Sequence, residues 1–134
     1  MKIAIITVGE LPVPCVRGGG AETLINQILD ENERRGQIEF IVYSIDNEEA
    51  KKKTEKYKKT KFIFLPEKKN SIGQRIKRKY IKVTTGFHIP LERFSYDEII
   101  SSIEAEDVDY VLIENTMVPF SKYVKIFGEK VLLH

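Results

Sequence analysis

The 134-residue chain carries 22 lysines and arginines against 20 acidic residues, a formal net charge of +2. Its hydrophobic content of 42% and charged content of 31% fit one soluble globular domain and exclude disordered and fibrous proteins. No signal peptide accompanies the first apolar run, and no apolar stretch approaches the roughly 18–20 residues that span a bilayer. One cysteine, Cys15, and two distant histidines, His88 and His134, predict a cytoplasmic protein without a disulfide or a dedicated metal site.

The charges are unevenly distributed along the chain. The segment from Lys51 to Lys82 holds 12 lysines and 2 arginines against Glu55 and Glu67, a local balance of +12, and the remainder has a balance of −10. This polarity predicts that the domain is steered toward an anionic surface. A solvated loop and helix face would have the same composition, so charge alone leaves both interpretations open.

The first third of the chain predicts a strand, a loop, a helix and a second strand. Ile3–Val8 is a nearly continuous apolar run, as in a strand covered on both faces. Gly9–Arg17 contains Pro12 and Pro14 and predicts a long irregular loop, the kind that holds ligands. A helix from Ala21 to Arg35 and a strand over Glu39–Ile45 follow. The apolar stripe of that helix consists of Leu24, Ile25, Ile28 and Leu29, and Gly36 ends it.

The middle of the chain is rich in lysine. Glu48–Tyr57 predicts a short helix, and Lys61–Leu65 predicts a third strand that Pro66 ends. Ser71–Val83 predicts a basic amphipathic helix, because it carries apolar residues at four-residue spacing, namely Ile72, Ile76 and Tyr80. Residues 84–94 contain a glycine and a proline and predict a loop.

The last third predicts two helices and two strands. Ser95 with Glu98 three residues later has the capping-box arrangement, and Ile99, Ile100 and Ile103 make the buried face of that helix. Asp109–Ile113 predicts the fourth strand and Lys130–Leu133 the fifth. Pro119 suits the first position of the helix between them. The predicted inner face of this helix consists of Phe120, Tyr123, Val124 and Phe127, and Gly128 ends it.

Strands that alternate with helices predict right-handed βαβ units. The predicted fold class is therefore α/β, with a three-layer, doubly wound parallel sheet of the Rossmann-like type. No repeat, low-complexity tract or linker divides residues 1–134, so we expect a single domain. Because the sequence ends inside a predicted strand, we expect this domain to be a piece of a longer polypeptide.

A glycine-rich stretch lies where the long loop meets the first helix, and it consists of Arg17, Gly18, Gly19, Gly20, Ala21 and Glu22. The unpaired N–H groups and the dipole of a helix start favour an anion such as a phosphate. Glycines remove the β-carbons that would block its approach. The alternative is that the glycines only let the chain turn and pack closely against the sheet.

Other candidate residues follow predicted strands, because ligands of parallel α/β sheets bind beyond the carboxyl ends of the strands. Glu114 and Asn115 follow the fourth strand, and His134 follows the fifth. Glu114 fits either a general base or a group that holds a substrate hydroxyl; capping of the helix at Pro119 is the alternative. Asp46 after the second strand fits a ribose contact less well, since Gly-x-Gly-x-x-Gly does not directly follow the first strand.

Three segments resemble the N-terminal half of family 4 glycosyltransferases, which have the two-domain GT-B fold. Met1–Thr7, the long loop and Gly18–Glu22 are similar to the family's first strand, glycine loop and helix start. Asp109–Asn115 resembles its fourth strand and the loop after it. Lys130–His134 resembles the next strand, which often ends in a histidine. Many relatives carry a histidine after the fourth strand, where this chain has Glu114.

The resemblance implies the acceptor-side domain of a retaining glycosyltransferase of bacterial surface polysaccharide synthesis. Its partners would be a nucleotide-sugar donor, a saccharide or lipid-linked acceptor and a C-terminal donor domain, with no metal or resident cofactor. Because that donor domain is not in this chain, the chain alone is expected to be inactive. The resemblance implies that Gly18, Gly19 and Gly20 lie near the donor phosphates. We predict Glu114 and His134 as catalytic residues, and the predicted donor-phosphate and substrate contacts are Arg17, Gly18, Gly19, Gly20, Glu22 and Asn115.

The basic segment gains a meaning from this resemblance. Family members that build surface polysaccharides often take lipid-linked acceptors at the cytoplasmic face of the membrane. The resemblance therefore implies peripheral contact with anionic lipid at the inner face of the cell membrane. The basic face expected to make it consists of Arg75, Lys77, Arg78, Lys79 and Lys82.

Two other functions fit parts of the sequence. One is a non-catalytic basic module that docks on an anionic membrane or on nucleic acid. The other is a nucleotide-binding oxidoreductase domain, which the interrupted glycine motif disfavours. Nucleic acid is not expected as a partner, because the aromatic residues of the basic segment predict core positions rather than a stacking platform; these are Tyr57, Phe62, Phe64 and Tyr80.

Overall fold

The computed structural model describes residues 1–7, 10–68, 71–86, 95–114 and 120–134, with the backbone alone at Gln74 and Arg78. The strands are β1 (Lys2–Ile6), β2 (Glu39–Ile45), β3 (Thr60–Leu65), β4 (Tyr110–Ile113) and β5 (Val131–Leu133). The helices are α1 (Gly20–Arg35), α2 (Glu48–Lys53), α3 (Ile72–Thr85), α4 (Tyr96–Glu106) and α5 (Phe120–Phe127), with short 3₁₀ turns η1 (Thr54–Lys56) and η2 (Gly128–Lys130). Most predicted elements therefore exist within a few residues of their expected bounds.

The five strands form one sheet in the order β3-β2-β1-β4-β5, and every neighbouring pair is parallel. Ile5 of β1 is in register with Val42 of β2 and with Leu112 of β4. Aliphatic and β-branched residues fill the central strands because a parallel sheet is normally covered on both faces. This arrangement confirms the predicted α/β class with a parallel sheet and is consistent with a Rossmann-like fold.

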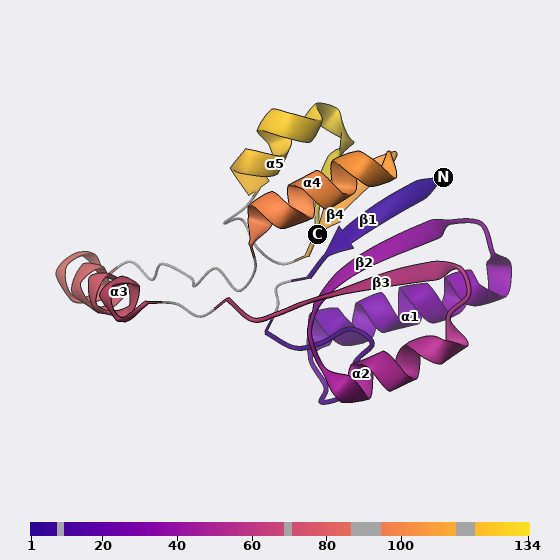
Figure 1. The fold of residues 1–134 in the computed structure, drawn as a ribbon, viewed down its shortest axis with the longest axis horizontal. Coiled ribbons are helices and arrows are strands. Elements are labelled where there is room, and N and C mark those ends of the chain that lie inside the picture. The colour runs from indigo at the N-terminus through magenta and orange to yellow at the C-terminus, as the bar shows by residue number, and fades with distance from the viewer. Residues whose placement is uncertain (8–9, 69–70, 87–94, 115–119) are drawn as a thin grey trace.

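Alternate residues along each strand contribute to two hydrophobic cores, one on each face of the sheet. Figure 1 shows α4 and α5 on one side of the strands and α1 and α2 on the other. The core on the α4 face includes Ala4, Ile6, Ile99, Ile103 and Tyr123. The core on the α1 face includes Ile5, Val42, Ile25 and Leu29. Packing of these two faces fixes the register of the sheet, because a slip of one residue would exchange them.

Two predicted inner faces are narrower than expected. In α1, Ile25 and Leu29 are buried, whereas Leu24 and Ile28 are each 37% exposed. In α5, the predicted inner residue Val124 is 38% exposed. A helical period predicts the side of a helix that is apolar, but the neighbouring element decides how much of that arc it covers. The predicted inner faces of α1 and α5 therefore lie on the correct side of each helix, but each prediction included residues that are half-exposed.

The ends of two elements also differ from expectation. β1 ends at Ile6 rather than at residue 8. α4 begins after Ser95 as predicted, but the Ser95 side chain makes no capping hydrogen bond. Instead, the Ser95 carbonyl accepts from the Ile99 N–H at 3.3 Å. Gly36 ends α1 as predicted, with a left-handed φ of 63° that favours glycine.

Helix α3 contradicts the prediction that Tyr80 is a core residue. The helix forms where expected, but Ile72, Ile76 and Tyr80 are all exposed, so Tyr80 is not a core residue. In Figure 1, α3 stands apart from the sheet, beyond the end of β3. Sequence spacing identified an amphipathic helix correctly, but it carries no information on whether another element covers that helix.

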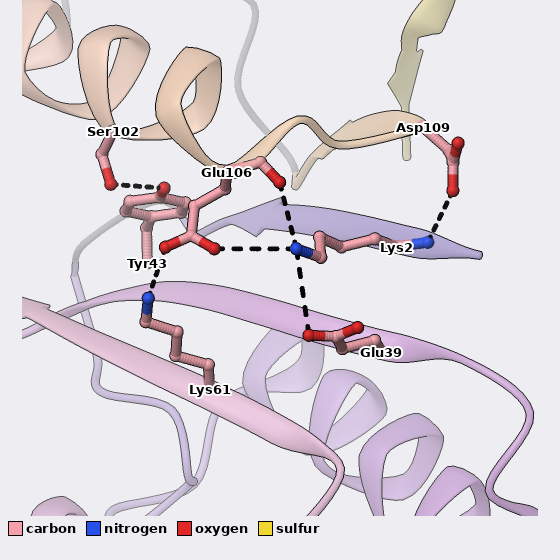
Figure 2. Close-up of polar contacts among 7 residues, drawn as sticks. All are labelled: Lys2, Glu39, Tyr43, Lys61, Ser102, Glu106 and Asp109. Atoms are coloured by element: carbon pink, nitrogen blue, oxygen red, sulfur yellow. Dashed lines mark hydrogen bonds and ion pairs between the residues drawn. The ribbon is translucent and has the colours of Figure 1, made fainter.

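An ion cluster ties α4 to the amino ends of the strands (Figure 2). Lys2 Nζ donates to the Glu106 carbonyl at 3.0 Å and lies 3.8 Å from Glu106 Oε2 and 3.9 Å from Glu39 Oε1. Lys61 also pairs with Glu106, and the Lys2 N–H donates to Asp109 Oδ2 at 2.7 Å. The hydrogen bond from Lys61 holds the pKa of the Glu106 carboxyl below its ordinary value.

Two buried tyrosines share the core on the α4 face but differ in their hydrogen bonds. The Tyr43 hydroxyl donates to Ser102 Oγ at 2.9 Å (Figure 2). The Tyr123 hydroxyl is buried and finds no hydrogen-bond partner among the residues that the structure describes. Burial raises the pKa of both phenols, so both remain protonated at neutral pH.

Candidate functional site

The carboxyl ends of all five strands lie along one edge of the sheet, because every pair is parallel. The strand order reverses between β1 and β4: the chain moves outward from β1 to β2 and β3, and later from β4 to β5. β1 is followed by α1 on one face and β4 by α5 on the other (Figure 1). In open α/β sheets, ligands bind in the crevice at such a point. The carboxyl edge at β1 and β4 is therefore the candidate site.

The loop between β1 and α1 is anchored before it reaches the glycines. Val13 is fully buried, and its N–H donates to Ser44 Oγ of β2 at 2.8 Å. The Cys15 N–H donates to Asn26 Oδ1 of α1 at 3.1 Å, and Lys53 Nζ of α2 donates to the Cys15 carbonyl at 3.0 Å. These contacts satisfy main-chain groups of a long irregular loop. They also fix the position of Gly18, Gly19 and Gly20 at the end of the loop.

The three glycines have different surroundings. Gly18 and Gly19 have φ values of 83° and 124°, which residues with a β-carbon rarely adopt. A Cβ on Gly19 would overlap Glu22 Oε2 and lie 2.8 Å from Leu11 Cδ1. A Cβ on Gly18 or on Gly20 would meet nothing within 4 Å. Backbone conformation thus favours glycine at both Gly18 and Gly19, and close contacts require it at Gly19 as well. Gly18 and Gly20 leave bare backbone facing open space.

The start of α1 has the features of an anion site. Gly19 is the N-cap of this 16-residue helix and has no side chain to accept from the first N–H groups, which carry the positive end of the helix dipole. Glu22 in the first turn is 7% exposed, and its carboxylate lies against Gly19. Arg17, Gly18 and Gly20 are exposed. An anion would therefore reach the helix start at Gly18 and Gly20.

Glu114 and His134 lie side by side at the same edge. Glu114 follows β4 directly, its N–H donates to the Ile6 carbonyl of β1 at 3.0 Å, and it is 1% exposed. His134 follows β5, and its N–H donates to the Ile113 carbonyl at 3.0 Å. The Nδ1 atom of His134 is 3.2 Å from Glu114 Oε2. The parallel pairing of β4 with β5 thus brings these two predicted residues into contact.

The second carboxylate oxygen of Glu114 is unusual. Oε1 is buried, and within the described part of the chain it makes no hydrogen bond. Burying an unpaired polar atom costs free energy, so such atoms are rare in folded proteins and need an explanation such as a catalytic role. Within the described residues, Oε1 therefore has an unused acceptor position, and burial separates it from solvent.

The His134 side chain is the accessible member of the pair. It is 56% exposed, against 2% for the side chain of Glu114. In the tautomer that carries the proton on Nδ1, His134 donates to Glu114 Oε2 and keeps Nε2 free to accept a proton. A buried carboxylate that orients a solvent-facing imidazole is an arrangement suited to general-base chemistry.

The predicted site residues fall in two places. The glycine stretch and the Glu114–His134 pair share the carboxyl edge of the sheet, and Asn115 lies outside the described residues. The basic residues belong to α3, which stands apart from the sheet (Figure 1). The exposed side chains among them are Arg75, Lys77, Lys79 and Lys82, and the side chain of Arg78 lies outside the description. Asp46 pairs with Lys51 Nζ at 2.6 Å, which gives its carboxylate a structural role.

Sequence reasoning missed the residues that anchor the loop, which are Ser44, Asn26 and Lys53. Ser44 could have been identified from the sequence, because it is a serine inside the apolar run of β2. Such a serine is expected to be buried, as Ser44 is, and a buried hydroxyl needs a hydrogen-bond partner. Asn26 gave a weaker signal, as an amide directly after the buried Ile25. Lys53 gave none, since it is one of several lysines in a basic segment.

Two surface hollows in the described part of the chain lie away from this edge. One, of ≈ 470 Å³, is at the amino ends of β2 and β3, where Glu39, Lys58, Lys59 and Lys61 are among its lining residues. The other, of ≈ 390 Å³, lies beside α1 and includes Ile28. Neither is lined by Gly18, Gly19, Gly20 or Glu114, so these two hollows do not locate the candidate site.

The described residues include neither a metal-binding cluster nor a helix that could cross a membrane. Among the residues that the structure describes, no three His, Cys, Asp or Glu side chains are grouped so that they could hold a metal ion. None of the helices in the same residues combines the length and the apolar character needed to cross a bilayer.

Comparisons with protein-family models, with curated proteins and with solved structures found no match to this chain. The resemblance to glycosyltransferases therefore stays a prediction. The geometry of the carboxyl edge carries the functional argument that follows.

Proposed function

We propose that this chain is the N-terminal, acceptor-side domain of a retaining GT-B glycosyltransferase, with a three-layer, doubly wound fold. The enzyme transfers a sugar from a nucleotide-sugar to a saccharide or lipid-linked acceptor during surface polysaccharide synthesis in the cytoplasm. The observation that carries the proposal is the buried Glu114 carboxylate. One of its oxygens has no partner in the described part of the chain, and the other lies beside His134, where the strand order reverses. The resemblance of the glycine stretch supports the same conclusion.

Glu114 and His134 suit the hydroxyl group of a sugar acceptor. The exposed His134 side chain accepts the hydroxyl hydrogen at Nε2, and the buried Glu114 carboxylate holds the imidazole through Nδ1. During transfer, the hydroxyl oxygen forms a bond to the anomeric carbon of the donor, and the bond from that carbon to the donor phosphate breaks. The hydroxyl proton passes to the Glu114–His134 pair, and the nucleoside diphosphate leaves.

The glycine stretch suits the diphosphate of the donor. Negative charge grows on the leaving diphosphate as the anomeric bond breaks, and N–H groups at a helix start stabilise such charge. Gly18 and Gly20 leave the backbone bare on the open side of the loop. Arg17 is exposed beside them and supplies a cation for the same oxygens.

An uncovered apolar surface supports a second half of the protein. Tyr110 of β4 is in register with Ile3, and Leu132 of β5 is in register with Leu112, so both lie on the α1 face of the sheet. Tyr110 is 40% and Leu132 is 46% exposed. Adjacent exposed apolar residues favour a packing partner. In the proposed enzyme, an element of the C-terminal half covers this part of the sheet.

The test is sugar transfer by the polypeptide that the whole reading frame encodes, assayed against a panel of nucleotide-sugars. We expect transfer from one of these donors. Gly20→Ala places a methyl group where no protein atom lies within 4 Å, so the fold is kept while phosphate approach is hindered and the KM for the donor rises. Gly73→Ala in α3, where a Cβ would make ordinary contact with Ser71 Oγ at 3.9 Å, is the matched control and should leave that KM unchanged.

Two results would contradict the proposal. A reading frame that stops after His134, or a full-length protein that transfers no sugar from any donor, would exclude the transferase. Unchanged kinetics in Gly20→Ala would remove the glycine loop from the donor site.

A further inference from the structure

Helix α3 exposes its whole apolar stripe. Ile72, Ile76, Tyr80 and Val83 are between 63% and 78% exposed. At 100° per residue, these four positions fall within an arc of about 80° on one side of the helix. Single exposed apolar residues are ordinary, but a continuous stripe on one element marks a binding surface. In Figure 1 the helix stands clear of the sheet, so this stripe is open to a partner.

The charge of α3 indicates the chemistry of that partner. The segment Ser71–Gly86 contains no acidic residue and five basic ones, which are Arg75, Lys77, Arg78, Lys79 and Lys82. Of these, the four whose side chains are described form no ion pair within the described part of the chain. On the helical wheel, Lys79 lies about 20° from the apolar stripe on one side, and Lys77 lies about 60° from it on the other.

Lysines elsewhere in the basic segment behave differently. Lys51, Lys56 and Lys61 pair with Asp46, Asp30 and Glu106, respectively. The positive charge of the segment is therefore partly neutralised next to the sheet and left uncompensated on α3. A partner of α3 must supply both negative charge and an apolar phase.

We propose that α3 docks in the plane of an anionic lipid bilayer. The apolar stripe lies at the boundary between headgroups and acyl chains, and the basic residues contact lipid phosphates. The 14 residues of α3 make a helix about 21 Å long at 1.5 Å per residue, so it lies along the surface and does not span it. This inference goes beyond the proposed function, because docking needs neither donor nor transfer.

Other occupants satisfy only half of the requirement. A second copy of α3 would bury the apolar stripe but would bring ten basic side chains together without an acidic one. Nucleic acid would neutralise the charge through its phosphates but would leave Ile72, Ile76 and Val83 in water. An anionic bilayer supplies both features.

The experiment uses a tryptophan reporter on the stripe. The chain contains no tryptophan, so Tyr80→Trp gives a single fluorophore on α3. We expect a blue shift of its emission, and quenching by brominated lipids, with vesicles of phosphatidylcholine and phosphatidylglycerol. Vesicles of phosphatidylcholine alone should produce neither change. Tyr110→Trp, at a half-exposed position on the sheet, should show no shift with either vesicle.

Matched variants separate the stripe and the charges from general surface effects. In the Tyr80→Trp background, Ile76→Ser should lower the vesicle partition coefficient roughly tenfold, and Lys79→Gln should lower it roughly fivefold. Ile126→Ser and Lys125→Gln on α5, which are also exposed, should leave it unchanged. Added salt should weaken binding of the parent protein. The substituted side chains are exposed, so circular dichroism should show an unchanged fold.

Several outcomes would overturn the proposal. They are equal binding to neutral and anionic vesicles, absence of binding at low salt, or equal binding by Ile76→Ser and the parent protein. A concentration-dependent dimer that Ile76→Ser abolishes would identify a second copy as the occupant. A spectral shift with duplex nucleic acid and none with vesicles would identify nucleic acid. None of these results bears on transfer to a soluble saccharide, so the proposed function is tested separately.

Discussion

At the amino edge of the sheet, Lys2 and Lys61 meet the carboxylate of Glu106 (Figure 2), and each of these charges has an opposite charge beside it. At the carboxyl edge, Glu114 is more deeply buried, yet one of its oxygens has no partner in the described part of the chain. The stability of the fold explains the first arrangement and does not explain the second. Edges of the same sheet can therefore be told apart by whether their polar groups are satisfied.

The loops at the two edges of the sheet also differ in length and in backbone conformation. Loops at the amino edge are short, as in the connection from α1 to β2, which Gly36 closes by donating to the Asn32 carbonyl at 2.6 Å. The connection from β1 to α1 is long and contains two glycines with positive φ. Backbone of this kind costs conformational freedom and is kept where a ligand must approach closely.

The largest expected effect comes from exchanging the two carboxylates for amides. In the proposed full-length enzyme, Glu114→Gln should lower the rate of sugar transfer by about 100-fold or more, because it removes a general base or its orienting partner. Glu106→Gln should leave that rate unchanged, because Glu106 belongs to the opposite edge. Steady-state kinetics of both variants measures the contrast, and similar losses in both would remove the functional distinction between the edges.

Replacing Glu114 should impair sugar transfer without lowering the stability of the fold. Glu114→Met removes a buried, half-paired carboxylate and fills its space with an apolar chain, so the free energy of unfolding should stay the same or rise. Urea unfolding of wild type and variant measures this change. A large loss of stability would show that Glu114 is a structural residue.

The second prediction separates two neighbouring glycines. Gly19→Ala should lower the free energy of unfolding by about 1–3 kcal/mol, because of its positive φ and the overlap of a Cβ with Glu22. Gly20→Ala should change it little or raise it slightly, since its Cβ enters open space at the first turn of α1. Equal losses in thermal or urea unfolding would contradict the described loop geometry.

The third prediction uses the two buried tyrosines as a paired comparison. Tyr43→Phe should cost about 1 kcal/mol of unfolding free energy, because it removes the hydrogen bond to Ser102. Tyr123→Phe should cost nothing or stabilise the protein, because its hydroxyl has no described partner. Denaturant unfolding of the two variants under one condition gives the difference, and the reverse order would contradict it.

The smallest expected effect is the pH dependence of the amino edge. The hydrogen bond from Lys61 holds the pKa of Glu106 below its ordinary value, so the ionised carboxyl stabilises the folded state above about pH 4.3. That stability is lost as the pH falls through the lowered, folded-state pKa. The stability difference between wild type and Glu106→Gln should therefore be largest near neutral pH and should shrink in acid. A difference that stays constant from neutral to acidic pH would exclude this ion cluster as its source.

The sequence predicted the strands and helices well because their periods are local properties. Runs such as Phe40–Val42 reveal a buried strand, and Gly36 marks a helix end through its backbone freedom. The exposure of Tyr80 on α3 was misjudged because burial depends on a neighbour that local spacing does not encode. The capping role of Ser95 was misjudged because the correct residue type does not ensure that its side chain makes the bond.

The candidate site was predictable in part. Parallel strands place their carboxyl ends together, so Glu114 and His134 were expected at one edge, and they are in contact there. The unpaired Oε1 could not be anticipated, because it depends on how tightly β1 and β4 enclose the carboxylate. The anchoring of the loop by Ser44 and Asn26 was also hidden, since it arises from contacts between β2, α1 and the loop.

The most direct test of the central claim follows amide signals of the 15N-labelled chain during titration with a nucleoside diphosphate. Because the proposed donor domain lies outside these 134 residues, we expect weak binding that is visible only at high ligand concentration. We expect shifts of Gly18, Gly20 and His134 at the carboxyl edge and none at Lys2. Shifts confined to the amino-edge hollow lined by Lys58 and its neighbours would contradict it.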